Sequence, residues 1–372
     1  MTSVYLDYNA SAPIRPQAAD AVARALGIGG NPSSVHARGR QARAVVETAR
    51  ATIAAAIGAD LQNLVFTSGG AEADALAIES AVAGGWAPLI VGAIEHEVVV
   101  ETARASGAQV HPLPVDERGL YDLDALAALL AGTSRPFVAM MLANNETGVI
   151  QPVAEAARLV RDAGGWLHVD AVQALGKMDI DFNALGADSL ALSAHKAGGP
   201  QGVGALVFGP RATLTRRLHG GGQERGRRAG TENLAGIAGF AAAVEAAVEA
   251  RVDNTPWRDA AAARVKAAGA VIVGEGAPRL GDTLCLAVPD WSSELQVMAL
   301  DLAGVMVSSG AACSSGKVKP SRVLEAMGLG DLAKGALRAS GGWATTEDDW
   351  NRFADAWVEA YGRYTARRQS AA

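Results

Sequence analysis

Short apolar runs alternate with helix-like stretches through the middle of the chain. The runs are almost continuously apolar, which is typical of strands buried on both faces of a parallel sheet. Between several of them lie stretches with helical spacing of apolar residues, such as 71–83 and 153–164. This alternation predicts an α/β, doubly wound domain with a mixed, mostly parallel sheet. The predicted strands fall within residues 63–70, 88–96, 108–115, 134–145, 166–173, 188–196 and 204–209.

A long Ala- and Glu-rich helical stretch at 234–252 ends this alternating pattern. After it come two strand-like runs and further helices. We therefore expect a large domain of residues 11–250 and a smaller α+β domain formed by residues 1–10 and 251–372. The length agrees with this division, because 372 residues exceed what one compact core usually holds.

Composition and charge argue against a disordered, a membrane-spanning or a nucleic-acid-binding protein. Apolar residues make up 49% of the chain, so it is not disordered, and no apolar run is long enough to span a bilayer. The formal net charge is −6 and no basic stripe occurs, which argues against a nucleic-acid partner. The first residues lack the pattern of a secretion signal, and the 2 cysteines form no disulfide framework. We expect a cytoplasmic chain with reduced thiols and no membrane partner.

Lys196 ends an apolar run and precedes a Gly-rich turn, so its amine has room to form a Schiff base with an aldehyde. Ser193 and His195 flank it and are suited to hydrogen-bond a phosphate. An isolated His-Lys pair more often opens a solvated loop, so the motif is informative only in combination. Lysine is rare in this chain, and the obvious rival is Lys177. It ranks lower because it follows Asp170 too closely.

Asp170 is the residue that makes the Lys196 motif informative, because it ends a predicted strand about one βα unit before Lys196. A carboxylate there is suited to pair with a pyridinium nitrogen and keep the ring an electron sink. The alternative is an aspartate that caps the next helix. The Gly69–Gly70 turn, which precedes a predicted helix, offers backbone N–H groups to a phosphate. Such a turn is common, so it carries little weight alone.

Nine segments of the chain resemble, in order, those of the cysteine desulfurases, which are fold-type-I enzymes of pyridoxal 5'-phosphate (PLP) grouped with the class V aminotransferases. One such segment would be weak support, whereas nine at compatible spacing are strong. The resemblance runs over nearly the whole chain and implies a homodimer with shared active sites. The segments are YLDYNASAP, GNPSSVHARGR, VFTSGGAEAD, IEHEVV, LANNETGVIQP, HVDAVQALGK, SAHKAGGPQGVGAL, HGGGQERGRRAGTEN and SSGAACSSGKVKPSRVLEAMG.

The resemblance implies a role for each matching residue, and it implies no metal ligand. Lys196 carries PLP, His96 stacks on its ring and moves protons, and Cys313 accepts sulfur from L-cysteine. Asn31 and Arg338 hold the substrate carboxylate, to which a guanidinium is well suited. The other implied cofactor-binding residues are Gly70, Ala71, Asn145, Asp170, Gln173, Ser193, His195 and, from the neighbouring subunit, Thr231.

The two cysteines lie in different surroundings. Cys313 belongs to a Ser/Gly-rich stretch with little capacity to pack, where a thiol is free to collect sulfur and deliver it. Lys317 and Lys319 nearby would favour its thiolate. An incidental exposed cysteine is the alternative, and the stretch alone does not exclude it. Cys285 lies among bulky apolar residues, so we assign it to the core.

The chain departs from the family pattern at several positions. Ala71 and Ala75 stand where Thr and Asn are usual, and Trp343 stands where a second Arg is common. The segment ASAP replaces a more usual Thr pair. The missing hydroxyl at Ala71 removes one hydrogen bond to a charged group, a loss of about 1.5–3 kcal/mol. These departures place cofactor affinity and substrate choice in question.

Three hypotheses follow from the sequence. The first is a cysteine desulfurase that delivers sulfur to an iron–sulfur scaffold or a sulfur-carrier protein. The second keeps the cofactor but changes the reaction to that of a selenocysteine lyase or another PLP-dependent amino-acid lyase. The third is a non-catalytic homologue that acts as a binding partner, for which the departures at Ala71, Ala75 and Trp343 are the only argument.

Overall fold

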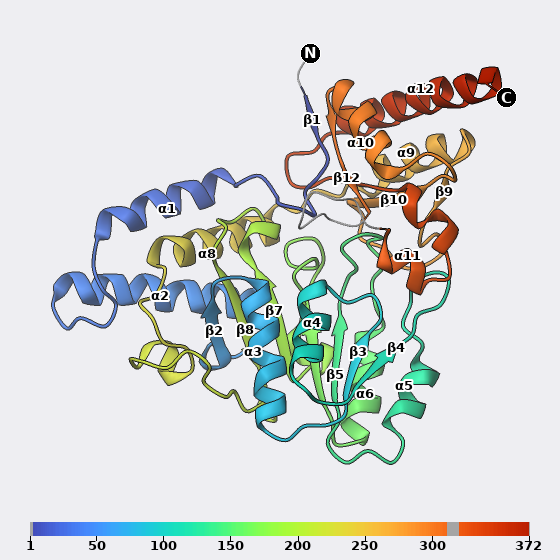
Figure 1. Cartoon of the computed structure of the whole chain (residues 1–372). Helices are drawn as coiled ribbons and strands as arrows, with labels where there is room; N and C mark the ends of the chain where they lie inside the picture. Colours follow the sequence, from blue (N-terminus) through green and yellow to red (C-terminus); the bar gives the residue numbers. More distant parts are fainter. Residues whose placement is uncertain (1–2, 311–319, 372) are drawn as a thin grey trace.

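A seven-stranded sheet lies at the centre of the computed structural model, which describes residues 3–310 and 320–371 (Figure 1). Its strand order is β2-β8-β7-β6-β5-β3-β4. The strands β3 to β7 pair in parallel, whereas β8 runs antiparallel to both of its neighbours. The predicted mixed, mostly parallel sheet is therefore confirmed. The strands are β2 (Leu64–Thr67), β3 (Leu89–Gly92), β4 (Val110–Leu113), β5 (Phe137–Met141), β6 (Trp166–Asp170), β7 (Ser189–Ser193) and β8 (Gly204–Phe208).

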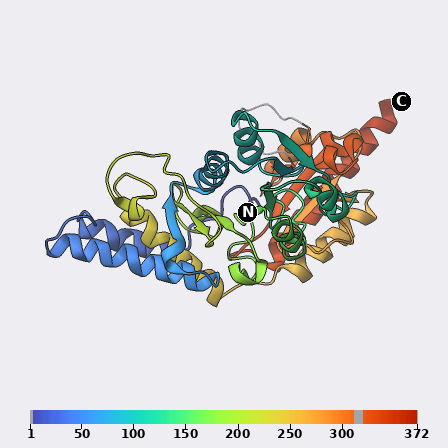
Figure 2. The same ribbon diagram turned by 90° about the horizontal axis from the view of Figure 1, so that it is seen from below.

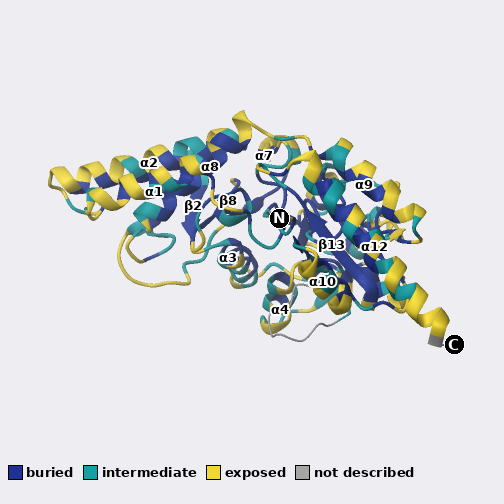
Figure 3. Ribbon diagram, turned by 90° about the horizontal axis from the view of Figure 1, so that it is seen from above, coloured by how far each residue is buried: buried dark blue, intermediate teal, exposed yellow. Residues whose placement is uncertain are grey.

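Helices cover both faces of this sheet. Successive strand residues point to opposite sides, so neighbouring residues of one strand pack against different helices. In β5, Val138 and Met140 belong to a core formed with α2 (Ala37–Ala56), α5 (Leu123–Leu130), α6 (Val153–Asp162) and α8 (Leu234–Glu249). Their neighbours Phe137 and Ala139 belong to a second core, with α3 (Gly70–Ala83) and α4 (Glu97–Ala105). Burial on both faces explains why the strands read as continuous apolar runs (Figure 3).

The remaining elements flank this layered body. α1 (Pro16–Ile28) packs beside α2 and α8, and the α1–α2 pair extends away from the sheets (Figure 2). A four-stranded antiparallel sheet has the order β12-β13-β10-β9, and β1 pairs in parallel with β11. The other elements are β1 (Val4–Tyr5), β9 (Val271–Ile272), β10 (Thr283–Ala287), β11 (Val305–Met306), β12 (Ser308–Ser309), β13 (Ala336–Ser340), α7 (Phe182–Leu185), α9 (Thr255–Ala267), α10 (Ser293–Leu302), α11 (Arg322–Ala326), α12 (Glu347–Ala371), η1 (Leu61–Asn63), η2 (Ala194–Lys196), η3 (Gln223–Gly226) and η4 (Gly330–Gly335).

The smaller sheet joins the two ends of the chain. Leu284 and Leu286 of β10 share an apolar core with Val4 near the N-terminus and with Trp357 of α12. Cys285 points the opposite way, into the core of the large sheet, and is 0% exposed. Its prediction as a core residue is confirmed, and burial raises the pKa of its thiol. Cys285 therefore links the smaller sheet to the core of the large one. The predicted domain boundaries at residues 10 and 250 stay a prediction.

Within residues 3–310 and 320–371, no helix is both long and apolar enough to cross a bilayer.

Candidate active site

A cavity of about 320 Å³ opens at the carboxyl ends of β5, β6 and β7. Parallel strands place their carboxyl ends at one edge of a sheet, which is where α/β folds bind ligands. The cavity collects most of the residues that the sequence singles out. The predicted site residues that line it are Gly70, Ala71, His96, Asn145, Asp170, Gln173, Ser193, His195, Lys196 and Arg338.

Lys196 lies on the short turn η2, three residues beyond the end of β7. Its Nζ donates hydrogen bonds to the carbonyl oxygens of Asn9 and Ala10, at 2.6 and 2.9 Å. Burial, followed by the positive charges of Arg338 and Lys177, lowers the pKa of Lys196 to about 8. About one amine in ten is therefore neutral at pH 7, and a neutral amine is the form that attacks a carbonyl carbon.

Asp170 ends β6 and faces the same cavity. Its Oδ1 accepts a hydrogen bond from the N–H of Val172 at 2.9 Å, within a turn, so the alternative of a helix-capping aspartate is wrong. The carboxylate forms no salt bridge within the described residues, and burial raises its pKa. A cationic ring nitrogen beside it would offset the cost of this buried charge.

The N-terminus of α3 forms another wall of the cavity. The first N–H groups of a helix lack intrahelical partners, and the helix dipole favours an anion there. Gly70 is required at this point, because a Cβ would lie 2.6 Å from Cγ2 of Val172. Ser193 and His195 add side-chain donors, whereas Ala71 offers only its backbone. Burial, together with the charge of Lys196, lowers the pKa of His195 to about 4, so His195 supplies a neutral N–H.

These groups together fit one kind of ligand. The backbone donors of α3 suit a phosphate, the buried carboxylate of Asp170 suits a ring nitrogen that gains a proton, and the amine of Lys196 suits an aldehyde. All three line a single cavity. The chemistry of the donor set therefore agrees with the cofactor that the resemblance implies.

Arg338 brings a positive charge to the cavity from β13 and is 1% exposed. Its Nη2 donates to Oδ1 of Asp7 at 2.8 Å, and its Nη1 donates to the carbonyl of Asn145 at 3.1 Å. Its Nε has no hydrogen-bond partner among the residues described. A buried donor without a partner costs about 1–3 kcal/mol, so a ligand carboxylate would be stabilised here. This ligand carboxylate would share the guanidinium group of Arg338 with Asp7.

His96 stands at the N-terminus of α4, at an exposed edge of the cavity. Its Nδ1 accepts a hydrogen bond from the N–H of Val98 at 3.3 Å. In the neutral ring this bond leaves the proton on Nε2, so His96 is able to exchange a proton between a ligand and solvent. Gln173 uses its amide within the protein, since its Nε2 donates to the carbonyl of Asn9 at 3.0 Å.

Two predicted residues, Asn31 and Thr231, are not brought into this cavity. Asn31 is exposed between α1 and α2, where its Oδ1 accepts from the N–H of Ser33 at 2.8 Å. Thr231 is exposed and lines a different pocket, together with Gly202. Cys313 lies outside the described residues, as do Lys317 and Lys319. The roles of these residues stay predictions, including that of Thr231 in a neighbouring subunit.

A second cavity, of about 330 Å³, is also lined by Lys196. Lys177 and Trp343 line it, but neither lines the cavity that holds Asp170. Nζ of Lys177 is 3.3 Å from Oδ2 of Asp282. This ion pair gives Lys177 a structural partner and supports its lower rank as the reactive amine. Of the substitutions at 71, 75 and 343, only Ala71 lines the cavity with Asp170, because Ala75 lines a third pocket.

The arginine-rich segment 216–228 packs against the large sheet. Arg228 pairs with Glu72 of α3 at 2.9 Å, and Glu224 pairs with the buried Arg50 of α2 at 2.8 Å. Arg227 lies over the ring of Phe208. Partners within the chain therefore engage these charges.

Sequence reasoning missed several residues that line the cavity. Two of them matter for polar chemistry: Asn9, which contacts Lys196, and Asp74, whose Oδ1 is 3.0 Å from Nε2 of His168. Asn9 belongs to a segment that carries the family resemblance, but its spacing suggests no contact with Lys196. The other missed residues are Ala10, Met141, Ala143 and Val172.

Comparison with known proteins shows the family of the chain. The family model of the class V aminotransferases matches residues 4–353. A cysteine desulfurase of Cereibacter sphaeroides is 40% identical over 94% of this chain and 93% of its own length. The cysteine desulfurase IscS of Dictyoglomus turgidum is 37% identical over 94% of this chain and 92% of its own length. The crystal structure of a NifS-like protein from Rickettsia africae has a TM-score of 0.89 at 32% identity and covers 97% of this chain and 99% of that one.

Proposed function

The chain belongs to the class V aminotransferase family, and we infer that it is a cysteine desulfurase. Such an enzyme converts L-cysteine to L-alanine and passes the sulfur on. The observation that carries this inference is one cavity that holds Lys196, Asp170, His96 and the N-terminus of α3. The two cysteine desulfurases named above are matched over more than nine-tenths of their length.

The proposed cofactor is pyridoxal 5'-phosphate, which supplies an aldehyde that captures amines and a ring that withdraws electrons from the substrate. Lys196 would hold the aldehyde end and Asp170 the ring nitrogen. Asn145 and Gln173 would face the ring hydroxyl. The phosphate would meet the backbone of Gly70 and Ala71 together with Ser193 and His195, and Thr231 of a neighbouring subunit.

The protein's own groups then have separate tasks. Arg338 orients the substrate carboxylate, and Asn31 is proposed to assist it. Nζ of Lys196 takes the proton from Cα, for which its pKa of about 8 makes it a suitable base near neutral pH. Nε2 of His96 handles the proton of the substrate thiol.

The proposed sulfur acceptor is Cys313. Its thiolate attacks the sulfur of the substrate, a new S–S bond forms, and the C–S bond breaks. The carbon that loses sulfur gains a proton, so L-cysteine and an enzyme thiol give L-alanine and an enzyme persulfide. Atoms and electrons balance without an external oxidant or reductant. The Ser/Gly-rich surroundings of Cys313 in the sequence support this role.

The experiment that tests this proposal is anaerobic incubation with L-cysteine, with alanine quantified and any persulfide located by mass spectrometry. Cys313→Ser should retain the absorbance of the bound cofactor and lose the persulfide. Cys285→Ser is the matched control, because this thiol is buried in the core. Full turnover by Cys313→Ser with no added acceptor, or a persulfide on Cys285, would show that the acceptor is assigned wrongly.

The partners follow from the same proposal. We propose a homodimer, which the exposure of Thr231 outside the chain's own cavity supports. Sedimentation should then give twice the mass of the 38.0 kDa chain. An iron–sulfur scaffold or a sulfur carrier would receive the persulfide sulfur. The proposed compartment is the cytoplasm, where thiols are kept reduced.

A further inference from the structure

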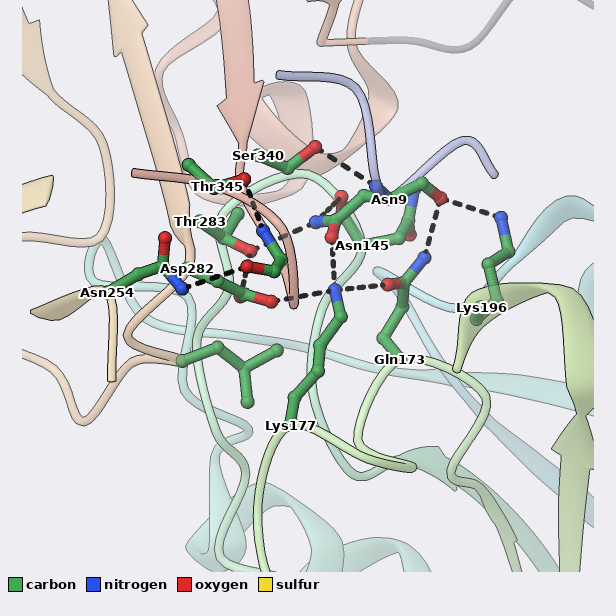
Figure 4. A network of polar contacts seen from close by, with 12 residues as sticks. Asn9, Asn145, Gln173, Lys177, Lys196, Asn254, Asp282, Thr283, Ser340 and Thr345 are labelled. Carbon is green, nitrogen blue, oxygen red and sulfur yellow. Dashed lines mark hydrogen bonds and ion pairs between the residues drawn. The ribbon is translucent and has the colours of Figure 1, made fainter. Parts of the chain in front are cut away.

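Asn9 connects the N-terminal segment with the walls of the cavity (Figure 4). It is 1% exposed, and its backbone N–H donates to Oγ of Ser340 at 3.0 Å. Its Nδ2 donates to the carbonyl of Asn145 at 3.1 Å and to Oγ1 of Thr283 at 3.0 Å. Its Oδ1 accepts a hydrogen bond from Nζ of Lys177. The side chain is therefore held on three sides by other segments.

The carbonyl oxygen of Asn9 faces Lys196. It accepts from Nζ of Lys196 at 2.6 Å and from Nε2 of Gln173 at 3.0 Å. The carbonyl of Ala10 accepts from the same Nζ at 2.9 Å. Two neighbouring carbonyl groups thus form a cradle for the amine, and Figure 4 shows Lys196 and Lys177 approaching Asn9 from different sides.

The segment that carries this cradle is fixed along its length. The N–H of Tyr8 donates to the carbonyl of Ser340 at 3.1 Å, and the N–H of Ala12 donates to the carbonyl of His195 at 2.9 Å. Close packing adds to these bonds, because a Cβ at Gly342 would lie 2.0 Å from Cδ1 of Tyr8. The two carbonyl groups therefore occupy defined positions relative to Lys196.

We propose that Asn9 is a positioning residue, whose side chain fixes the carbonyl groups of Asn9 and Ala10 as a cradle for the free ammonium group of Lys196. The inference rests on the proposed function, in which Lys196 is released when the substrate arrives and then receives a proton. Carbonyl oxygens stabilise the charged amine and set its direction, so it stays beside the cavity. Being uncharged, they hold it less firmly than a carboxylate would, and the amine is able to leave.

Several charged groups act on the same amine. Two positive groups oppose its protonation and two carboxylates favour it, whereas the neighbouring histidine is uncharged. An Asn9→Ala substitution keeps all of them, and Lys177 keeps its contacts with Gln173 and Asp282. A change in the titration of Lys196 would then report on the cradle. The groups are Arg338, Lys177, His195, Asp7 and Asp170.

The test is competitive labelling of the full-length chain after removal of its cofactor. Trace acetic anhydride is added between pH 6 and 11, and the acetylated Lys196 peptide is quantified by mass spectrometry. The wild-type midpoint is expected at about 8. Asn9→Ala keeps both carbonyl groups but no longer fixes them against the charged amine, so it should lower the midpoint by about 1 pH unit and raise labelling at pH 7 severalfold. An unchanged or higher midpoint would overturn the proposal.

Asn254→Ala is the matched control, because Asn254 is also 1% exposed and joins three groups without touching Lys196. Its Nδ2 donates to the carbonyls of Val252 and Gly342, and its Oδ1 accepts from Nε1 of Trp350. This variant should lose thermal stability and keep the midpoint of Lys196. An equal shift in both variants would mean general loosening of the fold and would also overturn the proposal.

A milder variant covers the case in which Asn9→Ala does not fold. Thr283→Val removes one acceptor of Nδ2 of Asn9 and should lower the midpoint by a smaller amount. A folded Thr283→Val chain with the wild-type midpoint would then count against the cradle. The labelling needs no substrate, so a wild-type chain that makes no alanine would defeat the proposed function alone. An unchanged midpoint beside normal alanine formation would defeat only the cradle.

Discussion

Lys177 and Lys196 lie on two sides of Asn9, and they differ in what balances their charge. Lys177 is 3.3 Å from a carboxylate oxygen of Asp282, whereas the hydrogen bonds of Lys196 go to two carbonyl oxygens. Burial lowers the pKa of both amines, but among the residues that the structure describes only Lys177 forms a salt bridge with a carboxylate that opposes the change. A reactive lysine is therefore better recognised from the chemistry of its partners than from its burial.

The largest effect is expected from removing Lys196, the amine that is held by carbonyl oxygens. Lys196→Ala should lower alanine formation from L-cysteine by at least about 1,000-fold, because a positioned acid–base group contributes roughly 10²–10⁴-fold and cofactor attachment is lost as well. Lys266→Ala is a suitable control, since Lys266 lies at the surface and pairs with Glu275. Alanine formation and the cofactor absorbance are the measurements. Substantial turnover by Lys196→Ala would reverse the ranking of Lys196 over Lys177.

The next effect concerns stability. Lys177→Met should lower the free energy of unfolding by about 3–5 kcal/mol, because it leaves the largely buried Asp282 without its cation. Adding Asp282→Asn should restore most of this loss, since the unpaired charge is then removed as well. Urea denaturation of the two variants gives both values. If the double variant were no more stable than Lys177→Met, the ion pair would not be the reason for the loss.

The smallest effect is expected at the N-terminus of α3, where we propose that the phosphate binds. Ala71→Thr should tighten cofactor binding by about tenfold, because one hydrogen bond to a charged group contributes about 1.5 kcal/mol or more. Ala75→Asn is the control, since Ala75 lines a different pocket. Rebinding of the cofactor to the cofactor-free chain, followed by absorbance, measures the change. Equal gains from both substitutions would show that Ala71 is not a missing phosphate donor.

Part of this arrangement could be predicted from the sequence. The apolar runs fix where the strands end, and parallel pairing brings Asp170 and Ser193 to one edge of the sheet. Lys196 follows three residues after the strand, so its place in the cavity also follows from local pattern. The assignments that could be made from periodicity and turn residues are therefore those nearest the strand ends.

Other parts depend on contacts that leave no local pattern. Asn9 meets Ser340 across 331 positions of the sequence, and no spacing rule predicts such a pair. Arg338 could be assigned only by resemblance, and its sharing with Asp7 comes from the packing of β13 beside the N-terminal segment. Asn31 and Thr231 lie on exposed connections, whose position against the proposed second subunit is not determined by the chain's own core.

The contact between Asn9 and Ser340 also bears on the order of events during synthesis. Asn9 is among the first residues to leave the ribosome, whereas Thr283 and Ser340, which hold it, are among the later ones. The large sheet can form from residues up to Phe208 before either partner exists. A nascent chain would therefore carry a formed sheet and an incomplete active site until synthesis is almost finished, and during that time the amine of Lys196 would lack the fixed carbonyl groups that hold it.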